Sequence, residues 1–281
     1  MDPLAGRIAV VTGAASGLGR AMALAFAAEG MHVALADVDE ANLARTADEV
    51  RARGVRALAL RTDVSRAVDV DMLAARTVSD LGGVHLVCNN AGVSPLGAAW
   101  ENSVADWRWA LGVNLWGVVH GVRAFTPHLL AQNEGHIVNT ASVAGLISPP
   151  GMSVYNVTKH AVVALSETLH HDLRERGAKV GVSVLCPAYV PTGIADSERN
   201  RPPEFADSAP VQSPELLAKK EGLKKAVRSG KVSADEVAQA VVAAIKGGHF
   251  YILTHPRIKG AIQARMQDIL DERSPRNPLA L

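Results

Sequence analysis

Residues 7–38 have the sequence RIAVVTGAASGLGRAMALAFAAEGMHVALADV, and this stretch decides the fold of the chain. It contains, in order, an apolar strand-like run, a glycine-rich turn, a helical pattern and a second apolar run that ends near Asp37. Gly13, Gly17 and Gly19 stand where the turn must fold tightly and let a diphosphate approach the backbone N–H groups of the helix N-terminus. The stretch therefore predicts a strand, a dinucleotide-binding turn and a helix.

Asp37 is the second element of this predicted site. It stands 24 positions after Gly13, near the distance at which a carboxylate meets the ribose hydroxyls of an adenine dinucleotide. The turn has the spacing T-G-x-x-x-G-x-G, which differs from the general fingerprint G-x-G-x-x-G. Its glycines can serve the same purpose, because they allow a tight turn and a close approach of the diphosphate to the backbone. Ser16 is uncharged where a basic residue could meet a 2′-phosphate, so the pattern favours NAD over NADP. The alternative is an ordinary glycine turn beside a solvated aspartate, which the strand, turn and helix context disfavours.

A second pattern lies near the middle of the chain. Tyr155 and Lys159 are four residues apart, and Ser142 lies 13 residues before the tyrosine. An i,i+4 pair projects from one face of a helix, so we expect the ammonium to lie beside the phenol and to lower its pKa. Such a phenol can exchange a proton with an alcohol or a ketone, while a serine hydroxyl holds the same oxygen. Taken alone the pattern is weak, since a solvated lysine beside a packed tyrosine has the same spacing.

With both patterns in view, the chain resembles the short-chain dehydrogenase/reductase family along nearly its whole length. The resemblance rests on T-G-A-A-S-G-L-G at residues 12–19, on N-N-A-G at residues 89–92, and on the spacing of Ser142, Tyr155 and Lys159. It implies a catalytic tetrad that consists of Asn114, Ser142, Tyr155 and Lys159. It also implies a set of cofactor contacts, namely Gly13, Ser16, Gly17, Leu18, Gly19, Asp37, Asp63, Val64, Asn90, Ala91, Gly92, Tyr155, Lys159, Pro187, Val190 and Thr192.

The resemblance also implies a role for each member of the tetrad. Tyr155 is the expected general acid and base, Lys159 lowers its pKa and holds the nicotinamide ribose, and Ser142 holds the reacting oxygen. Asn114 is expected to anchor a water that links Lys159 to solvent. The chain departs from the family at Ala188, where glycine is usual, and we expect the additional methyl group to shift the backbone under the nicotinamide.

Apolar runs alternate with helical patterns along the chain. The runs occupy residues 7–12, 32–36, 56–60, 85–89, 136–140, 182–186 and 250–254. The alternation indicates a sheet that helices cover on both faces. Right-handed crossovers then predict an α/β fold of the Rossmann type, with a doubly wound, mostly parallel seven-stranded sheet. We interpret residues 1–281 as one domain whose ligand lies outside the carboxyl ends of the strands.

Two segments depart from this alternation. Residues 193–232 contain several prolines and few large apolar residues before an amphipathic helical pattern at their end. They follow the expected nicotinamide segment, so we interpret them as a substrate lid, with an inert surface insertion as the alternative. Residues 255–281 are interpreted as a C-terminal helical extension with an apolar i,i+4 stripe. The stripe is expected to cover the substrate mouth, to pack on the last strand, or to dock on a second subunit.

Composition excludes several classes of partner. The net charge is +1, with 29 basic and 28 acidic residues, so nucleic-acid and membrane-surface roles have no electrostatic support. The sequence shows no membrane-spanning run and no leading signal segment. Cys88 and Cys186 each end an apolar run, which favours packed free thiols and a reducing cytoplasm over a disulfide or a metal site. His170 and His171 lack further ligands at metal spacing, so we expect no metal.

The expected substrate contacts are uncharged. They are Leu96, Val143, Met152, Tyr189 and Ile194. This set predicts an NAD-dependent enzyme that interconverts a secondary alcohol and a ketone, with an apolar or aryl substrate. The alternative is a non-catalytic NAD(H)-binding sensor or scaffold of the same fold. Trp109 and its neighbouring tryptophans are expected to pack in the core or between subunits, and the family precedent favours a homodimer or homotetramer.

Overall fold

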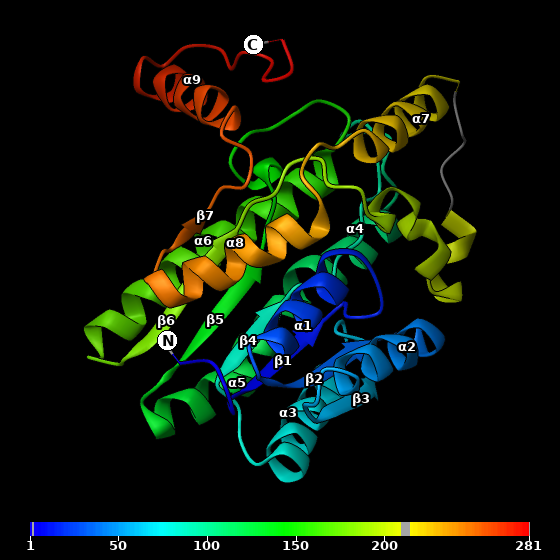
Figure 1. Cartoon of the computed structure of the whole chain (residues 1–281). Coiled ribbons are helices and arrows are strands. Elements are labelled where there is room, and N and C mark those ends of the chain that lie inside the picture. Colours follow the sequence, from blue (N-terminus) through cyan, green and yellow to red (C-terminus); the bar gives the residue numbers. More distant parts are fainter. Residues whose placement is uncertain (2, 209–213, 281) are drawn as a thin grey trace.

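A parallel sheet forms the centre of the fold (Figure 1). The computed structural model describes residues 1, 3–208 and 214–280. Its strands are β1 Ile8–Thr12, β2 His32–Asp37, β3 Ala57–Arg61, β4 Leu86–Asn89, β5 Gly135–Thr140, β6 Val180–Leu185 and β7 Tyr251–Ile252. They form a seven-stranded sheet in the order β3-β2-β1-β4-β5-β6-β7, and every neighbouring pair is parallel. The predicted Rossmann-type sheet is confirmed.

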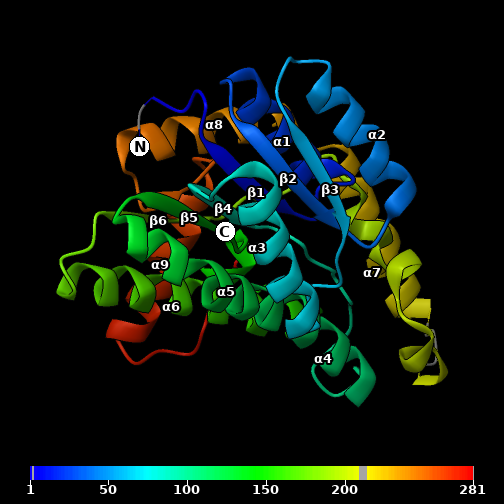
Figure 2. The same cartoon turned by 90° about the horizontal axis from the view of Figure 1, so that it is seen from below.

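Helices cover both faces of this sheet (Figure 2). One face carries α1 Gly17–Ala28, α2 Glu40–Arg51 and α8 Ala234–Gly247, and the other carries α3 Ala67–Leu81, α5 Gly117–Gln132 and α6 Ser153–Glu175. The alternation of side chains along β1 explains this arrangement, because Ala9 and Val11 join the core beneath α1 and α8. Ile8 and Val10 point to the opposite face and join the core beneath α3, α5 and α6.

The strand order reverses at β1, which pairs with β2 on one side and with β4 on the other. Ligands of open parallel sheets bind outside the carboxyl ends of the strands at such a reversal, because the crossover helices diverge there. In this chain the reversal brings the glycine turn after β1 beside the N-N-A-G segment after β4. The fold itself therefore places the predicted cofactor segments together.

A chain of buried polar side chains connects the central strands to α6. The Nδ2 atom of Asn89 on β4 donates to Oδ1 of Asn139 on β5, at 2.9 Å. The Nδ2 atom of Asn139 donates to Oγ of Ser166 on α6, at 3.0 Å, and that hydroxyl donates to the carbonyl oxygen of Val162. Because these groups are buried and hydrogen-bonded, they fix α6 against the sheet. The same helix carries Tyr155 and Lys159.

The segment 193–232, predicted as a lid or an insertion, is largely helical. It contains the 3₁₀ helices η3 Gly193–Asn200 and η4 Pro203–Ser208, and the predicted amphipathic helix is α7 Pro214–Arg228. Residues 209–213 of this segment lie outside the described residues. The next helix, α8, begins at a capping box in which Oγ of Ser233 accepts from the backbone N–H of Glu236, as its sequence indicates.

The C-terminal helix α9 Ile258–Leu270 lies apart from the sheet, in red at the top of Figure 1. Its stripe residues Met266, Ile269 and Leu270 are 46%, 53% and 74% exposed, so they pack neither on the last strand nor over the site. Ile258, at the start of the helix, lines the cavity described below. The outer residues of the stripe are therefore not covered by the described part of the chain, and docking on a second subunit stays a prediction.

Both cysteines are free and buried, as the sequence predicts. Burial raises the pKa of the Cys186 thiol to about 12, so this thiol stays protonated near neutral pH. The described residues contain no cluster of His, Cys, Asp and Glu that could hold a metal ion. None of the described helices is long and apolar enough to cross a membrane.

Candidate active site

A cavity of about 790 Å³ opens at the carboxyl ends of the strands. Every predicted cofactor contact lines it, together with Ser142 and four of the predicted substrate contacts, namely Val143, Met152, Tyr189 and Ile194. Asn114 and Leu96 do not line it. The cavity therefore gathers residues from both halves of the sheet around the switch between β1 and β4.

The glycine turn has the geometry that a close backbone approach requires. Gly13 and Gly17 have φ values of +68° and +53°, which side chains disfavour. A Cβ atom at Gly13 would lie 2.9 Å from Cα of Ala91, and one at Gly19 would collide with the carbonyl oxygen of Gly13. The turn thus leaves its backbone bare at the N-terminus of α1, where N–H groups and the helix dipole favour an anion.

The carboxylate of Asp37 is oriented by backbone donors on both of its oxygens. Oδ2 accepts from the N–H of Ala15 in the turn at 2.9 Å, and Oδ1 accepts from the N–H of Asp39 at 3.0 Å. Each carboxylate oxygen can accept more than one hydrogen bond, so both retain capacity for ribose hydroxyls. The side chain is half-buried at the cavity wall, where its negative charge opposes a 2′-phosphate.

The N-N-A-G segment joins the ends of β1, β4 and β5. Asn90 donates from Nδ2 to the carbonyl oxygen of Thr12 at 2.9 Å, and its N–H donates to the Thr12 hydroxyl at 2.8 Å. The hydroxyl of Thr140 donates to Oδ1 of Asn90 at 3.2 Å. Asn90 is therefore a structural connector whose amide is satisfied by protein groups, and Ala91 and Gly92 follow it along the cavity wall.

Tyr155 and Lys159 project from successive turns of α6 into the cavity, as the i,i+4 spacing predicts. Nζ of Lys159 donates to the carbonyl oxygen of Thr140 at 2.8 Å and lies 5.6 Å from the centroid of the Tyr155 ring. Ser142 follows β5, and its hydroxyl approaches the carbonyl oxygen of Pro187 at 3.4 Å and lies close enough to the tyrosine to lower the pKa of the phenol. The structure thus brings together the serine, the phenol and the ammonium that the sequence spacing singles out.

The expected pKa shift of Tyr155 is wrong in sign. Burial raises the pKa of this phenol to about 12, against a smaller lowering effect of the hydrogen bond with Ser142. Burial also lowers the pKa of Lys159 to about 8. Both shifts have one cause, since a low-dielectric site disfavours the charged form of each group. The ammonium bonds to Thr140 and not to the phenol oxygen, so it does not overcome the desolvation of the tyrosine.

Asn114 lies in a π-helical turn, η1 Leu111–Trp116, between α4 Val104–Ala110 and α5. Its fully buried amide donates to the carbonyl oxygen of Val93 at 2.9 Å and to the hydroxyl of Thr158 at 3.1 Å. Its Oδ1 accepts from the N–H of Val93 at 2.8 Å. These contacts tie the N-N-A-G segment to α6, so the side chain positions the site from outside the cavity wall. A π-helical turn at such a position is common near functional sites.

The segment from Pro187 to Thr192 crosses the cavity after β6. The carbonyl oxygen of Pro187 accepts from the N–H of Val143 at 3.0 Å, which holds it beside Ser142. Ala188 donates its N–H to Nδ1 of His255 at 3.2 Å, a contact that local sequence patterns did not indicate. Asn133 and Glu272 are the non-glycine residues with positive φ among those described, so the backbone of Ala188 does not adopt the left-handed conformation that favours glycine. The expected shift of the backbone under the nicotinamide stays a prediction.

The outer part of the cavity is mostly apolar. Besides the predicted contacts it is lined by Trp109, Ile147, Phe205, Leu223, Val227, Ile258 and Leu279. The sequence assigned Trp109 only to packing, and most of the others come from the lid or the C-terminal extension. Leu96 is a correction: its side chain is buried, and the neighbouring Gly97 pairs with Met152, so the loop turns this leucine away from the cavity.

Comparison with known proteins agrees with this geometry. Residues 7–203 match the family model described as short chain dehydrogenase. The chain belongs to the short-chain dehydrogenase/reductase family. A short chain dehydrogenase/reductase from Burkholderia phymatum, solved in complex with NAD, has a TM-score of 0.97 and 53% identity, over 100% of both chains. The Rossmann-type fold and the family resemblance inferred from the sequence are thereby confirmed.

Curated relatives of this short-chain dehydrogenase are also oxidoreductases. The CLA biosynthesis dehydrogenase/reductase of Lactiplantibacillus plantarum is 31% identical over 96% of this chain and 95% of its own length. The 1-deoxy-11-beta-hydroxypentalenate dehydrogenase of Streptomyces exfoliatus is 35% identical over 94% of this chain and 88% of its own length. The likeness therefore extends past the cofactor half into the lid and the C-terminal part of the chain.

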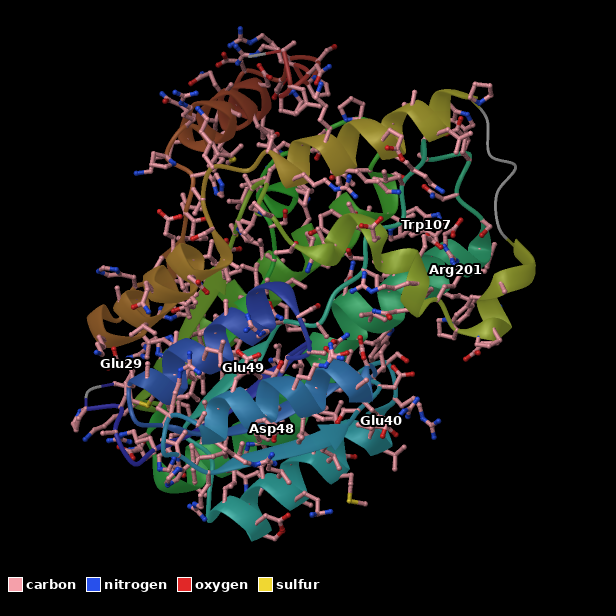
Figure 3. All side chains as sticks on the ribbon, turned by 45° about the vertical axis from the view of Figure 1, so that its right-hand side comes forward. Glu29, Glu40, Asp48, Glu49, Trp107 and Arg201 are labelled. Carbon is pink, nitrogen blue, oxygen red and sulfur yellow. The ribbon has the colours of Figure 1, made fainter. Side chains whose placement is uncertain are left out.

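In this short-chain dehydrogenase, Arg201 attaches the 193–232 segment to α4 (Figure 3). Its Nη2 donates to Oδ1 of Asp106 at 2.7 Å and its Nε to Oε2 of Glu198 at 2.6 Å, while the guanidinium lies 4.3 Å from the ring centroid of Trp109. The side chains of Arg201 and Asp106 are only 9% and 2% exposed. Asp106 also accepts from the N–H and hydroxyl of Ser103, so this buried pair holds both α4 and the 193–232 segment.

The Arg201→Met variant tests the strength of this attachment. Without the guanidinium, the Asp106 carboxylate stays buried and loses its counter-charge, and we expect the free energy of unfolding to fall by about 3 kcal/mol. Urea denaturation followed by circular dichroism measures the change. The control is Arg76→Met, which breaks the exposed Arg76–Asp80 pair and should leave the midpoint nearly unchanged because water screens that pair. Equal midpoints for wild type and Arg201→Met would show that the buried pair does not hold the lid.

Proposed function

We propose that this chain is an NAD-dependent oxidoreductase that interconverts a secondary alcohol and a ketone. The observation that carries the proposal is the Tyr155 phenol, which lies in the cavity wall with the Ser142 hydroxyl beside it and the Lys159 ammonium one helical turn away. A hydroxyl and a phenol that share one oxygen-binding position are the groups that proton transfer to or from an alcohol oxygen requires.

The residues present fit a nicotinamide dinucleotide. The bare turn at Gly13 and Gly19 admits a diphosphate at the N-terminus of α1, and the Asp37 carboxylate is held at the position of the adenosine ribose. In this proposal the segment from Pro187 to Thr192 contacts the carboxamide of the nicotinamide ring. When bound, this cofactor supplies a hydride acceptor for oxidation and a hydride donor for reduction. The NAD complex of the Burkholderia phymatum relative supports this assignment.

Tyr155 transfers the proton in this mechanism. In reduction its phenol gives a proton to the carbonyl oxygen, and in oxidation its phenolate removes the hydroxyl proton. Ser142 donates a hydrogen bond to the same oxygen and so fixes its distance from the phenol. Lys159, held by the carbonyl oxygen of Thr140, binds the nicotinamide ribose, and Asn114 holds the N-N-A-G segment against α6.

The substrate in this proposal is an apolar or aryl secondary alcohol or its ketone. The outer cavity is lined by Trp109, Met152, Phe205 and Leu223, and burial of apolar area there favours bulky groups. The 193–232 segment acts as a lid that excludes water from the hydride path. A non-catalytic sensor of the same fold is the weaker alternative, because a binding protein has no need for a phenol and a serine at one oxygen position.

The Tyr155→Phe variant tests the reaction. We expect turnover to fall by at least about 10²-fold, the lower limit for a lost general acid and base, while NADH binding stays within about twofold. Nicotinamide absorbance with a panel of ketones and alcohols measures turnover, and NADH fluorescence measures binding. The control is Tyr251→Phe, which removes the phenol that donates to Glu167 on the outer strand. Near-normal turnover in Tyr155→Phe, or no turnover by wild type across the panel, would contradict the proposal.

The pH profile gives this test a second readout. Because the pKa of Tyr155 is raised to about 12, the phenol is the main form near neutral pH. Alcohol oxidation uses the phenolate. As long as the pH lies below the pKa, the phenolate fraction rises about tenfold for each unit by which the pH increases. We therefore expect kcat/KM for oxidation to rise between about pH 6 and about pH 7, below the Lys159 pKa of about 8, where the ammonium keeps most of its charge, and that for reduction not to rise. The residual activity of Tyr155→Phe should lack the rise.

Cofactor preference follows from Asp37. We expect a higher kcat/KM with NADH than with NADPH, since the carboxylate repels a 2′-phosphate. Asp37→Asn removes the charge and keeps an oxygen for the Ala15 N–H, so it should narrow the preference without opening the turn. Asp48→Asn, an exposed carboxylate of α2 whose partner Arg51 does not line the cavity, is the control. A wild-type preference for NADPH would show that Asp37 does not select the cofactor.

Substrate preference follows from the apolar outer cavity. Each additional buried methylene contributes about 0.8 kcal/mol, so kcat/KM should increase by about fourfold for each one along a series of secondary alcohols. Leu223→Ala, in the cavity wall, should reduce the gain for the largest substrates, while Leu217→Ala on the exposed face of the same helix should not. A preference for a short or carboxylated hydroxy acid, or equal losses in both variants, would rule out this substrate class.

A further inference from the structure

We propose that Arg199 of the lid is a cofactor-binding residue that contacts the diphosphate of NAD(H) from the side opposite the glycine turn. The proposal rests on the proposed function and adds a residue that neither motif spacing nor family resemblance assigns. It makes the lid part of the cofactor site as well as part of the substrate site.

The position of η3 brings Arg199 to the turn. Thr192, which directly precedes this helix, packs against Gly17, since a Cβ atom there would lie 3.1 Å from Cβ of Thr192. The Arg199 side chain folds back along η3 toward that contact. Its Nη1 donates to the carbonyl oxygens of Gly193 and Asp196, both at 2.9 Å, and Nη2 lies 3.2 Å from the position of a Cβ atom on Gly193. The guanidinium is thus held at the start of η3, directly after the residue that packs against Gly17.

Arg199 lies on the side of the cavity that is proposed to hold the cofactor. Arg199 and Gly17 both line the cavity, as does Asp39, which follows the ribose carboxylate along the chain. A hydrogen bond from Asn42 lowers the pKa of Asp39 most, and the charge of Arg199 lowers it further, which places the guanidinium within electrostatic range of that carboxylate. Arg201, only two positions along the sequence, instead bonds α4 at the substrate side.

The donors of Arg199 are free for an anion. Arg61 and Arg66 also line the cavity, but they pair with Glu40 at 3.5 Å and with Asp69 at 3.4 Å. Within the described part of the chain, Arg199 forms no ion pair with a carboxylate, and its hydrogen bonds there use Nη1 alone. Nε and Nη2 therefore remain for phosphate oxygens, which a guanidinium fork matches well.

The glycine turn needs such a counter-charge. Residues 13–19 contain no charged side chain, so the turn offers a diphosphate only N–H groups and the dipole of α1. The next cation, Arg20, points away and pairs with Glu49 on α2, which Figure 3 labels. A cation from the lid is then the group that balances the charge. The 2′-phosphate of NADP is a less favourable partner, because Asp37 and Asp39 lie at the ribose end of the cavity.

The experiment compares Arg199→Gln, Arg199→Lys and wild type by direct binding. Kd is measured for NADH by fluorescence, and for ADP-ribose and adenosine by isothermal titration calorimetry. We expect Arg199→Gln to weaken NADH and ADP-ribose by about tenfold, the effect of a lost hydrogen bond to a charged group, with adenosine unchanged. Arg199→Lys should retain part of the affinity, and added salt should weaken wild type more than Arg199→Gln. The control Arg108→Gln removes a cation of the cavity lining that lies on α4.

The outcomes separate this inference from the proposed function. Equal Kd values for NADH in wild type and Arg199→Gln would overturn the role of Arg199 and leave the proposed function standing. An equal loss for adenosine would show a general distortion of the site, and a loss confined to NADPH would show a contact with the 2′-phosphate; either result overturns the diphosphate contact. If wild type binds neither NADH nor ADP-ribose, the proposed function and the inference both fail.

Discussion

Close packing of bare backbone at the carboxyl end of β1 is the constraint on which the rest of the structure depends. A side chain at Gly19 would collide with Gly13, and one at Gly13 would lie 2.9 Å from the backbone of Ala91. Thr12 holds Asn90 by its carbonyl and its hydroxyl, so the ends of β1 and β4 form one rigid unit. This unit sets the position of α6, because the close-packed strands of the sheet pass any displacement of β1 and β4 on to the helix.

Desolvation, more than the pairing of charges, governs the chemistry of this site. Burial raises the pKa of Tyr155 and lowers that of Lys159, so the protein by itself favours a neutral phenol and a weakened ammonium. A proton donor is what a carbonyl oxygen needs in reduction. Removal of a proton from an alcohol requires the phenolate, which this environment disfavours. Burial therefore favours the phenol, the form that can donate a proton, over the phenolate, and the pH sets the ratio of the two forms.

The sequence predicts the parts of the fold that local patterns encode. Strand periodicity and the glycine turn predict the doubly wound, mostly parallel seven-stranded sheet, and the i,i+4 spacing predicts that Tyr155 and Lys159 share one face of α6. It fails where long-range contacts decide. Arg201 meets Asp106 across 95 residues of sequence, and no local signal announces that contact. The sign of the Tyr155 shift was likewise mistaken, because spacing reports neighbours and not burial. Leu96 was misplaced because its loop bends at the bridge between Gly97 and Met152.

Two arginines of the lid show how the same residue type serves different ends. Arg201 has carboxylate partners and an aromatic face, is nearly buried, and fastens the lid to α4. Arg199 bonds only to backbone carbonyls of its own helix among the described residues, so it keeps both position and free donors. One short helix, η3, lies between the contact of Thr192 with Gly17 and the attachment of Arg201 to α4, so a single element connects the proposed cofactor and substrate sides of the cavity. Any coupling that this helix carries between the two ligands has to be reciprocal, because each ligand then changes the affinity for the other by the same factor.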